Sequence, residues 1–247
     1  MNTVLASLVT AFLGVADASS PPSRALDLKT PDGVVLKATL YPAAKPGPGV
    51  VMFNMCDGSD RSVWEPLATK LAMEGVSALT WNYRGVGDSG GEPFKGGSLE
   101  QVMRHWREVW GPDAALAVDT LAAEEGVDRL RLGVAGASCG GFLAVLTARR
   151  MPDRIRGVVF MAGPADDEAR RFVASPASPP FLGIAASGDA RSAAWTKELA
   201  ELSKHGSSRL VLYDEAGHGT QLLSSQKDLI PLMVEWLRET LRPPARP

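Results

Sequence analysis

The pattern of apolar and polar residues divides most of the chain into short strands and helices. Residues 24–29 and 34–41 alternate polar and apolar positions on either side of a Pro-Asp-Gly turn, which predicts an antiparallel hairpin at a sheet edge. Short, mostly apolar runs follow, and such runs are typical of parallel strands buried on both faces. These runs lie at residues 49–53, 76–81, 130–135, 156–162, 181–186 and 209–213.

Segments with helical periodicity separate the apolar runs. We expect helices at residues 62–74, 99–124, 142–150, 192–203 and 226–241. Gly75 should end the first of them, and Gly111-Pro112 should interrupt the second, with Asp113 as the N-cap of its second half. Strands that alternate with helices predict the α/β class, with a doubly wound, mostly parallel sheet beside the N-terminal hairpin. Functional residues of such sheets lie at the carboxyl ends of the strands.

The composition fits one domain with no unusual charge. The chain has 247 residues, of which 45% are hydrophobic, so it can bury one large core, and we assign residues 24–242 to a single domain. The net charge of -2 provides no basic surface for nucleic acid. No set of histidine, cysteine and carboxylate residues has the spacing of metal ligands, so we expect neither a metal nor a cofactor. The sequence leaves the oligomeric state open.

An apolar segment stands at the N-terminus. Residues 4–15 are predominantly apolar, and Ala16-Asp17-Ala18 after them is typical of a signal-peptide cleavage site. The segment is short for a transmembrane helix, so we expect no stable membrane span. We interpret residues 1–18 as a signal peptide of a secreted or periplasmic protein. Because residues 1–20 contain no Lys or Arg, the alternative is a cytoplasmic protein whose apolar N-terminal helix packs on its body.

The strongest chemical signal is Gly136-Ala137-Ser138-Cys139-Gly140, which lies between an apolar strand and a buried helix. In a G-x-S-x-G nucleophile elbow the serine sits on a strained turn that raises its hydroxyl above the sheet. The glycines are needed because strand and helix nearly collide there, and the helix N-terminus favours a developing oxyanion. This context predicts that Ser138 is a nucleophile.

Four motifs occur in the order found in α/β-hydrolases. They are the loop at residues 54–59, the Tyr83-Arg84-Gly85-x-Gly87-Asp88-Ser89 loop, the elbow, and Ala216-Gly217-His218-Gly219-Thr220. The chain therefore resembles this superfamily over residues 26–241, in particular the serine hydrolases similar to dienelactone hydrolases and small esterases or acyl-peptidases. The resemblance implies an α/β-hydrolase fold. Residues 163–180 are too few for a large helical lid, so we expect a minimal cap.

The resemblance also implies the roles in the site. Ser138 would be the nucleophile, His218 the base and Asp189 the acid. The oxyanion hole would consist of the backbone N–H groups of Cys139 and Cys56, with Met55 as the alternative to Cys56.

Other residues remain as alternatives or are set aside. Asp166 and Asp167 could supply the acid in place of Asp189, and a dyad without an acid is the third alternative. The remaining histidines, His105 and His205, are interpreted as surface or helix-end residues.

These residues predict a serine hydrolase that cleaves a carboxylic ester, or a related acyl bond, of a small-molecule substrate through an acyl-enzyme on Ser138. A second hypothesis is a cysteine enzyme of the dienelactone hydrolase type that uses Cys139. A third is a hydrolase-like binding protein without catalysis. Phe94, Trp106 and Trp110 either form the wall of an acyl pocket or pack on the sheet as core.

The two cysteines of the chain, Cys56 and Cys139, both flank the oxyanion hole in this assignment. Their side chains could therefore form a disulfide. The alternative is two buried free thiols that fill small gaps in the core.

Overall fold

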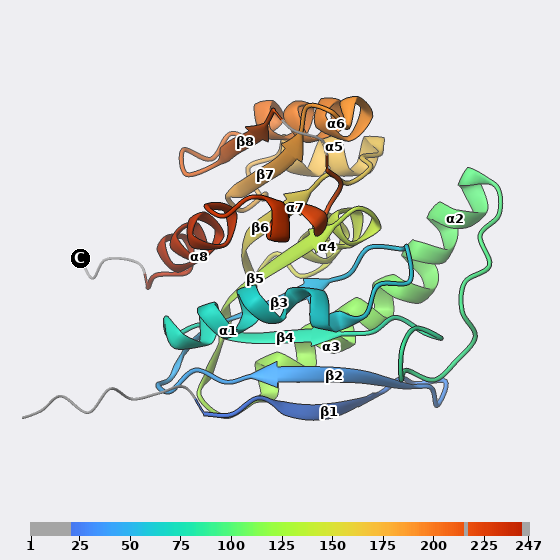
Figure 1. Ribbon diagram of the computed structural model, residues 1–247, viewed down its shortest axis with the longest axis vertical. Helices are drawn as coiled ribbons and strands as arrows, with labels where there is room; N and C mark the ends of the chain where they lie inside the picture. The colour runs from blue at the N-terminus through green and yellow to red at the C-terminus, as the bar shows by residue number, and fades with distance from the viewer. Residues whose placement is uncertain (1–20, 215–216, 244–247) are drawn as a thin grey trace, which may run out of the picture.

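One mixed sheet organises the part of the chain that the computed structural model describes, which is residues 21–214 and 217–243. The proposed signal peptide, residues 1–18, lies outside these residues. The eight strands lie in the order β1-β2-β4-β3-β5-β6-β7-β8 (Figure 1). Their bounds are β1 (Arg24–Lys29), β2 (Val35–Tyr41), β3 (Gly47–Phe53), β4 (Ser77–Trp81), β5 (Val127–Ala137), β6 (Ile155–Met161), β7 (Phe181–Ala186) and β8 (Arg209–Tyr213).

The strand directions confirm the predicted fold class. β1 pairs antiparallel with β2, and β2 pairs antiparallel with β4, whereas every later neighbour pair from β4 to β8 is parallel. The hairpin therefore forms one edge of the sheet, as its alternating pattern predicts. β4 and β7 are buried at every position, which explains why both strands consist mainly of apolar residues.

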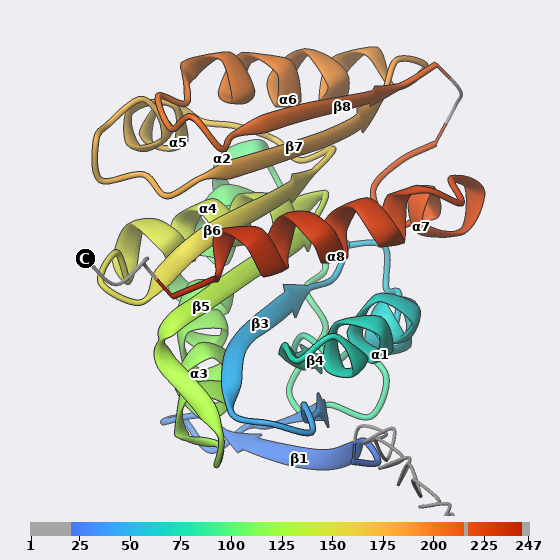
Figure 2. The ribbon, with the colours of Figure 1, turned by 90° about the vertical axis from the view of Figure 1, so that its left-hand side faces the viewer.

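Helices cover both faces of the sheet. Figure 2 shows α1 (Glu65–Met73), α7 (Gln221–Ser225) and α8 (Leu229–Thr240) in front of it. The opposite face is covered by α3 (Gly111–Ala123), α4 (Cys139–Arg150) and α6 (Ala190–Leu202). The shorter elements are η1 (Arg61–Trp64), α2 (Leu99–His105), η2 (Trp106–Trp110) and α5 (Asp167–Val173). No helix among the described residues has both the length and the apolar character that a membrane span requires.

The predicted interruption at Gly111-Pro112 is wrong. The chain stays helical from α2 through η2 into α3, and η2 is one turn of π-helix. A proline inside an α-helix lacks the N–H donor and its ring collides with the carbonyl one turn before it. The wider π turn directly before Pro112 relieves that collision. Asp113 consequently lies in the first turn of α3 and is not an N-cap.

Asp113 instead forms an ion pair with an arginine. The Arg84 guanidinium donates two hydrogen bonds to its carboxylate, at 2.7 and 2.8 Å, and also pairs with Asp32 in the hairpin turn. Asp113 is only 2% exposed, whereas the Asp32 side chain is 59% exposed. Arg84 therefore connects the hairpin and the loop after β4 to the buried end of α3.

We expect Arg84→Met to lower the free energy of unfolding by about 3 kcal/mol, because it leaves a buried carboxylate without its cation. Urea unfolding at pH 7, followed by circular dichroism, measures the change. Arg170→Met is the matched control, since Arg170 pairs with the more exposed Glu198 and its loss should cost less than about 1 kcal/mol. If both variants lost the same free energy of unfolding, this would contradict the conclusion that the buried Asp113 carboxylate depends on Arg84.

Candidate active site

The turn between β5 and α4 places Ser138 at the carboxyl edge of the sheet. Ser138 has φ 55° and ψ -124°, a conformation in the left-handed half of φ that is strained for a residue with a side chain. Its N–H donates to the carbonyl of Met161 at the end of β6, at 2.8 Å. Its own carbonyl accepts the N–H of Gly141 at 2.9 Å. These backbone bonds hold the strained residue between two strands and a helix.

Two glycines make this turn sterically feasible. A Cβ atom at Gly136 would overlap the carbonyl of Gly140, and a Cβ atom at Gly140 would overlap the carbonyl oxygens of Phe53 and Asn54. The end of β3, the end of β5 and the start of α4 therefore meet with backbone against backbone. The G-x-S-x-G spacing is the sequence signature of this contact.

Asp189 and His218 lie against each other beyond the ends of β7 and β8. The Asp189 carboxylate is 2.5 Å from His218 Nδ1, and it also caps α6 by accepting the N–H of Ser192 at 3.4 Å. Burial raises the pKa of the Asp189 carboxyl, but the hydrogen bonds from His218 and Ser192 outweigh it and hold that pKa below its usual value. The carboxylate is therefore ionised at neutral pH and can orient a neutral or a charged imidazole.

The two alternative acids are engaged elsewhere. Asp166 caps α5 by accepting the N–H of Ala169 at 2.7 Å, and it also pairs with Arg107. The Asp167 side chain is 83% exposed and lies 3.3 Å from Arg170. Of the three carboxylates considered from the sequence, Asp189 is the one that the structure brings to His218.

The loop that carries His218 packs against the elbow through neighbouring residues. A Cβ atom at Gly219 would lie 3.3 Å from the Cβ atom of Ala137, the residue before Ser138. Among the described residues, no hydrogen bond joins the Ser138 hydroxyl to His218. Such contacts are often long in enzymes without substrate. The structure thus brings the loop of His218 against the elbow of Ser138.

The Met55 side chain has a role that the sequence pattern does not predict. It is 5% exposed, and its sulfur accepts the N–H of Thr220 at 3.2 Å and the Thr220 hydroxyl at 3.3 Å. Met55 therefore connects the loop after β3 to the loop of His218. The two residues are 165 positions apart, and no local pattern marks such a pair.

The other two histidines lie away from this contact. His105 is the last residue of α2, which agrees with the predicted helix end, but it is half-buried: its ring stacks on Phe94 with 4.2 Å between ring centroids and meets Trp110 edge-on. Burial lowers the pKa of His105. His205 is exposed, as expected, in the segment before β8.

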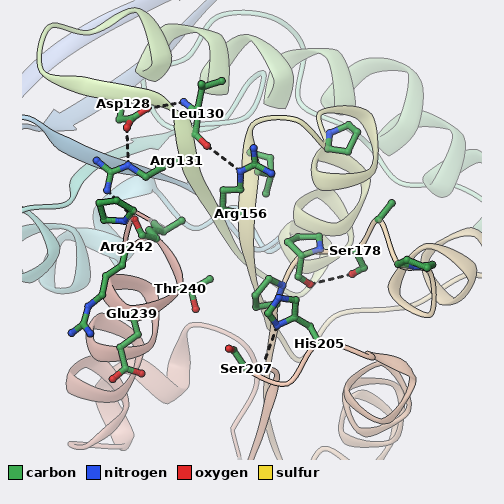
Figure 3. A pocket seen from close by; sticks show the side chains of 18 residues that line it. Asp128, Leu130, Arg131, Arg156, Ser178, His205, Ser207, Glu239, Thr240 and Arg242 are labelled. Atoms are coloured by element: carbon green, nitrogen blue, oxygen red, sulfur yellow. Dashed lines mark hydrogen bonds and ion pairs between the residues drawn. The ribbon is translucent and has the colours of Figure 1, made fainter. Parts of the chain in front are cut away.

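Two cavities lie at opposite ends of the sheet. One of about 240 Å³ is lined by Met55 and Cys56 and by the aromatic rings of Tyr83, Phe94 and Trp110. Trp110 is 3% exposed and part of the core, so its ring is both wall and core, whereas Trp106 packs in the core and does not line this cavity. Another, of about 760 Å³, is lined by residues at the starts of β5 and β6 and by His205, which Figure 3 shows from close by. Because it lies at the amino ends of the strands, it is remote from Ser138.

Cys56 and Cys139 form a disulfide with their Cα atoms 5.9 Å apart. The alternative of two buried free thiols is therefore wrong, and Cys56 is moreover exposed. The described residues contain no group of histidine, cysteine or carboxylate side chains arranged to hold a metal ion.

Comparison with known proteins agrees with this architecture. A model of the family described as serine aminopeptidase, S33, matches residues 50–186. An uncharacterized protein of Mycobacterium tuberculosis (strain CDC 1551 / Oshkosh) is 32% identical over 142 residues, which are 56% of this chain and 46% of that protein. The chain thus aligns with about half of this relative's length.

Solved structures confirm the α/β-hydrolase fold. A dienelactone hydrolase from Anabaena variabilis superposes with a TM-score of 0.69 at 22% identity, covering 90% of this chain and 100% of that one. An esterase from Pyrobaculum calidifontis superposes with a TM-score of 0.60 at 17% identity, covering 91% and 88%.

We expect Asp189→Asn to lower the free energy of unfolding by about 1 kcal/mol at pH 7, because asparagine keeps the helix cap but loses the charged hydrogen bond to His218. The lowered pKa makes the carboxylate stabilising above the ordinary carboxyl pKa of about 4, and this contribution disappears as the pH falls through the folded-state value. Urea unfolding of both proteins should show the difference shrinking from pH 5 towards pH 3. A difference that grows on acidification would contradict this pairing.

Proposed function

This chain belongs to the serine aminopeptidase S33 family of α/β-hydrolases, and we propose that it cleaves a carboxylic ester of a small substrate through an acyl-enzyme on Ser138. The observation that carries the proposal is the 2.5 Å contact between Asp189 and His218, in a loop that packs against the elbow of Ser138. A serine hydroxyl is a weak nucleophile unless an oriented base removes its proton.

The proposed reaction has two halves. His218 accepts the Ser138 proton as the Ser138 oxygen attacks the ester carbonyl, and it then donates that proton to the leaving alcohol. Asp189 holds the imidazole in the tautomer whose other nitrogen faces the serine and stabilises the imidazolium that forms. Water then attacks the acyl group on Ser138 while His218 accepts a proton from the water. His218 returns this proton to the Ser138 oxygen as the carboxylic acid leaves.

Backbone N–H groups would stabilise the oxyanion. Cys139 is the first residue of α4, so its N–H has no acceptor within the helix. The N–H of Cys56 has no hydrogen-bond acceptor among the described residues. Each donor in such a hole contributes about 3 kcal/mol to transition-state stabilisation.

Several features favour a small acyl substrate and a serine nucleophile. The segment between β6 and β7 contains only the seven-residue α5, too little for a large lid, and the nearby cavity is about 240 Å³. The structural likeness to an esterase supports an ester as the substrate.

The disulfide removes the free thiolate that catalysis by Cys139 would require. It also supports export of the protein, because disulfides persist in oxidising compartments.

We expect Ser138→Ala and His218→Ala each to lower kcat for p-nitrophenyl acetate by at least about a thousandfold. Ser138→Ala should also abolish labelling by a fluorophosphonate probe. The matched control is His205→Ala, which should change kcat less than about twofold, because His205 lies at the amino ends of the strands.

Other outcomes would overturn the proposal in distinct ways. Labelling that survives in Ser138→Ala and is lost in Cys139→Ala would identify a cysteine enzyme. Preferred cleavage of aminoacyl p-nitroanilides over esters would identify a peptidase. Neither labelling nor turnover of an ester series would indicate a binding protein without catalysis.

A further inference from the structure

The disulfide joins the two residues whose backbone N–H groups form the proposed oxyanion hole. Cys139 follows Ser138 at the start of α4, and Cys56 lies in the loop after β3. The two cysteines are 83 residues apart in the sequence, and their Cα atoms are 5.9 Å apart. A covalent bond of this kind restricts how far one donor can move relative to the other.

The loop after β3 has contacts on both sides of Cys56 but few at Cys56 itself. Asn54 is fully buried and hydrogen-bonds to the end of β4, and Met55 is buried against the loop of His218. Asp60 accepts a hydrogen bond from a side chain that follows β4. Among the described residues, no hydrogen bond or ion pair connects residues 56–58 to another element of the fold. The disulfide is therefore the bond that holds this stretch in place.

The two ends of the disulfide differ in accessibility. Cys139 is 1% exposed, and its sulfur lies 3.8 Å from the carbonyl oxygen of Asn54. Cys56 is exposed and lines the cavity of about 240 Å³. A small thiol in solution can therefore reach the bond from the Cys56 side, whereas Cys139 stays within the core of the elbow.

We propose that the Cys56–Cys139 disulfide is a positioning element of the oxyanion hole, so that its reduction by a dithiol lowers turnover while the fold persists. The inference rests on the proposed function, because it takes the N–H groups of these two residues as the oxyanion donors. Asn54 and Met55 keep their buried contacts after reduction, so only the stretch from Cys56 onward is released. The donor on Cys139 stays in place because α4 is buried.

The redox step needs an external dithiol such as dithiothreitol. One of its thiolates attacks the exposed Cys56 sulfur, the Cys56–Cys139 bond breaks, and Cys139 leaves as a thiolate that takes up a proton. The second thiol of the reductant then attacks the mixed disulfide, closes its own cyclic disulfide and releases Cys56 as a thiol. The protein gains two electrons and two protons, and the dithiol loses them.

We expect reduction to lower kcat and kcat/KM for p-nitrophenyl acetate by the same factor, about tenfold to a hundredfold, with KM within about twofold. The Ki of a boronic acid transition-state analogue should rise by a similar factor, since the analogue needs the same donors. The full chain is assayed before and after treatment with dithiothreitol, which is removed by desalting. Thiol titration of denatured protein should find no free thiol before treatment and two after it. Reoxidation should restore kcat.

Cys56→Ser provides the matched variant. It should have the low kcat of the reduced protein and should not respond to dithiothreitol. Circular dichroism and urea unfolding should show a folded, cooperative protein both for this variant and for the reduced wild type. A purely structural disulfide would instead lower stability without lowering kcat at an unchanged KM.

The possible failures are distinguishable. If oxidised wild type neither hydrolyses esters nor reacts with a fluorophosphonate, the proposed function fails. If it does both, but full reduction changes kcat less than twofold, the positioning role fails and the proposed function stands. Two thiols titrated without reductant, or loss of the cooperative unfolding transition on reduction, would also overturn the positioning role.

Discussion

β5 can pass directly into α4 only because Gly136 and Gly140 have no side chains. Any Cβ atom at either position would overlap backbone carbonyl groups of α4 or of β3, so three segments of backbone meet at one point. The same crowding holds Ser138 at a positive φ and at the edge of the sheet. The loops after β3, β7 and β8 are then arranged around this turn, because the parallel strands all end at the same edge.

These loops are joined by contacts of different chemistry. An ionised carboxylate holds His218, a buried thioether accepts hydrogen bonds from Thr220, and a disulfide ties Cys56 to the start of α4. Loops otherwise tend to be the mobile part of an α/β fold. The proposed reaction needs its reacting groups held within a fraction of an ångström, and covalent and buried contacts between loops restrain the chain in that way.

The strands were predictable because burial on both faces demands consecutive apolar residues, and the hairpin because one exposed face demands alternation. The helix through Gly111-Pro112 was not. A local rule places a break at proline, but Trp106 and Trp110 are both buried, and their packing favours a continuous helix with a π turn that accommodates the ring. Tertiary packing outweighed the local preference there.

The sequence by itself determined the α/β architecture, the elbow around Ser138 and the order of the motif-bearing loops along the chain. Each of these features depends on patterns of residues that are close together in the chain. Only the tertiary structure decided that Asp189, and not Asp166 or Asp167, meets His218, and that the two cysteines are bonded. Those pairings depend on the direction in which each loop leaves the sheet. Direction results from the packing of the whole fold, and residues far apart in the chain carry no local signal of it.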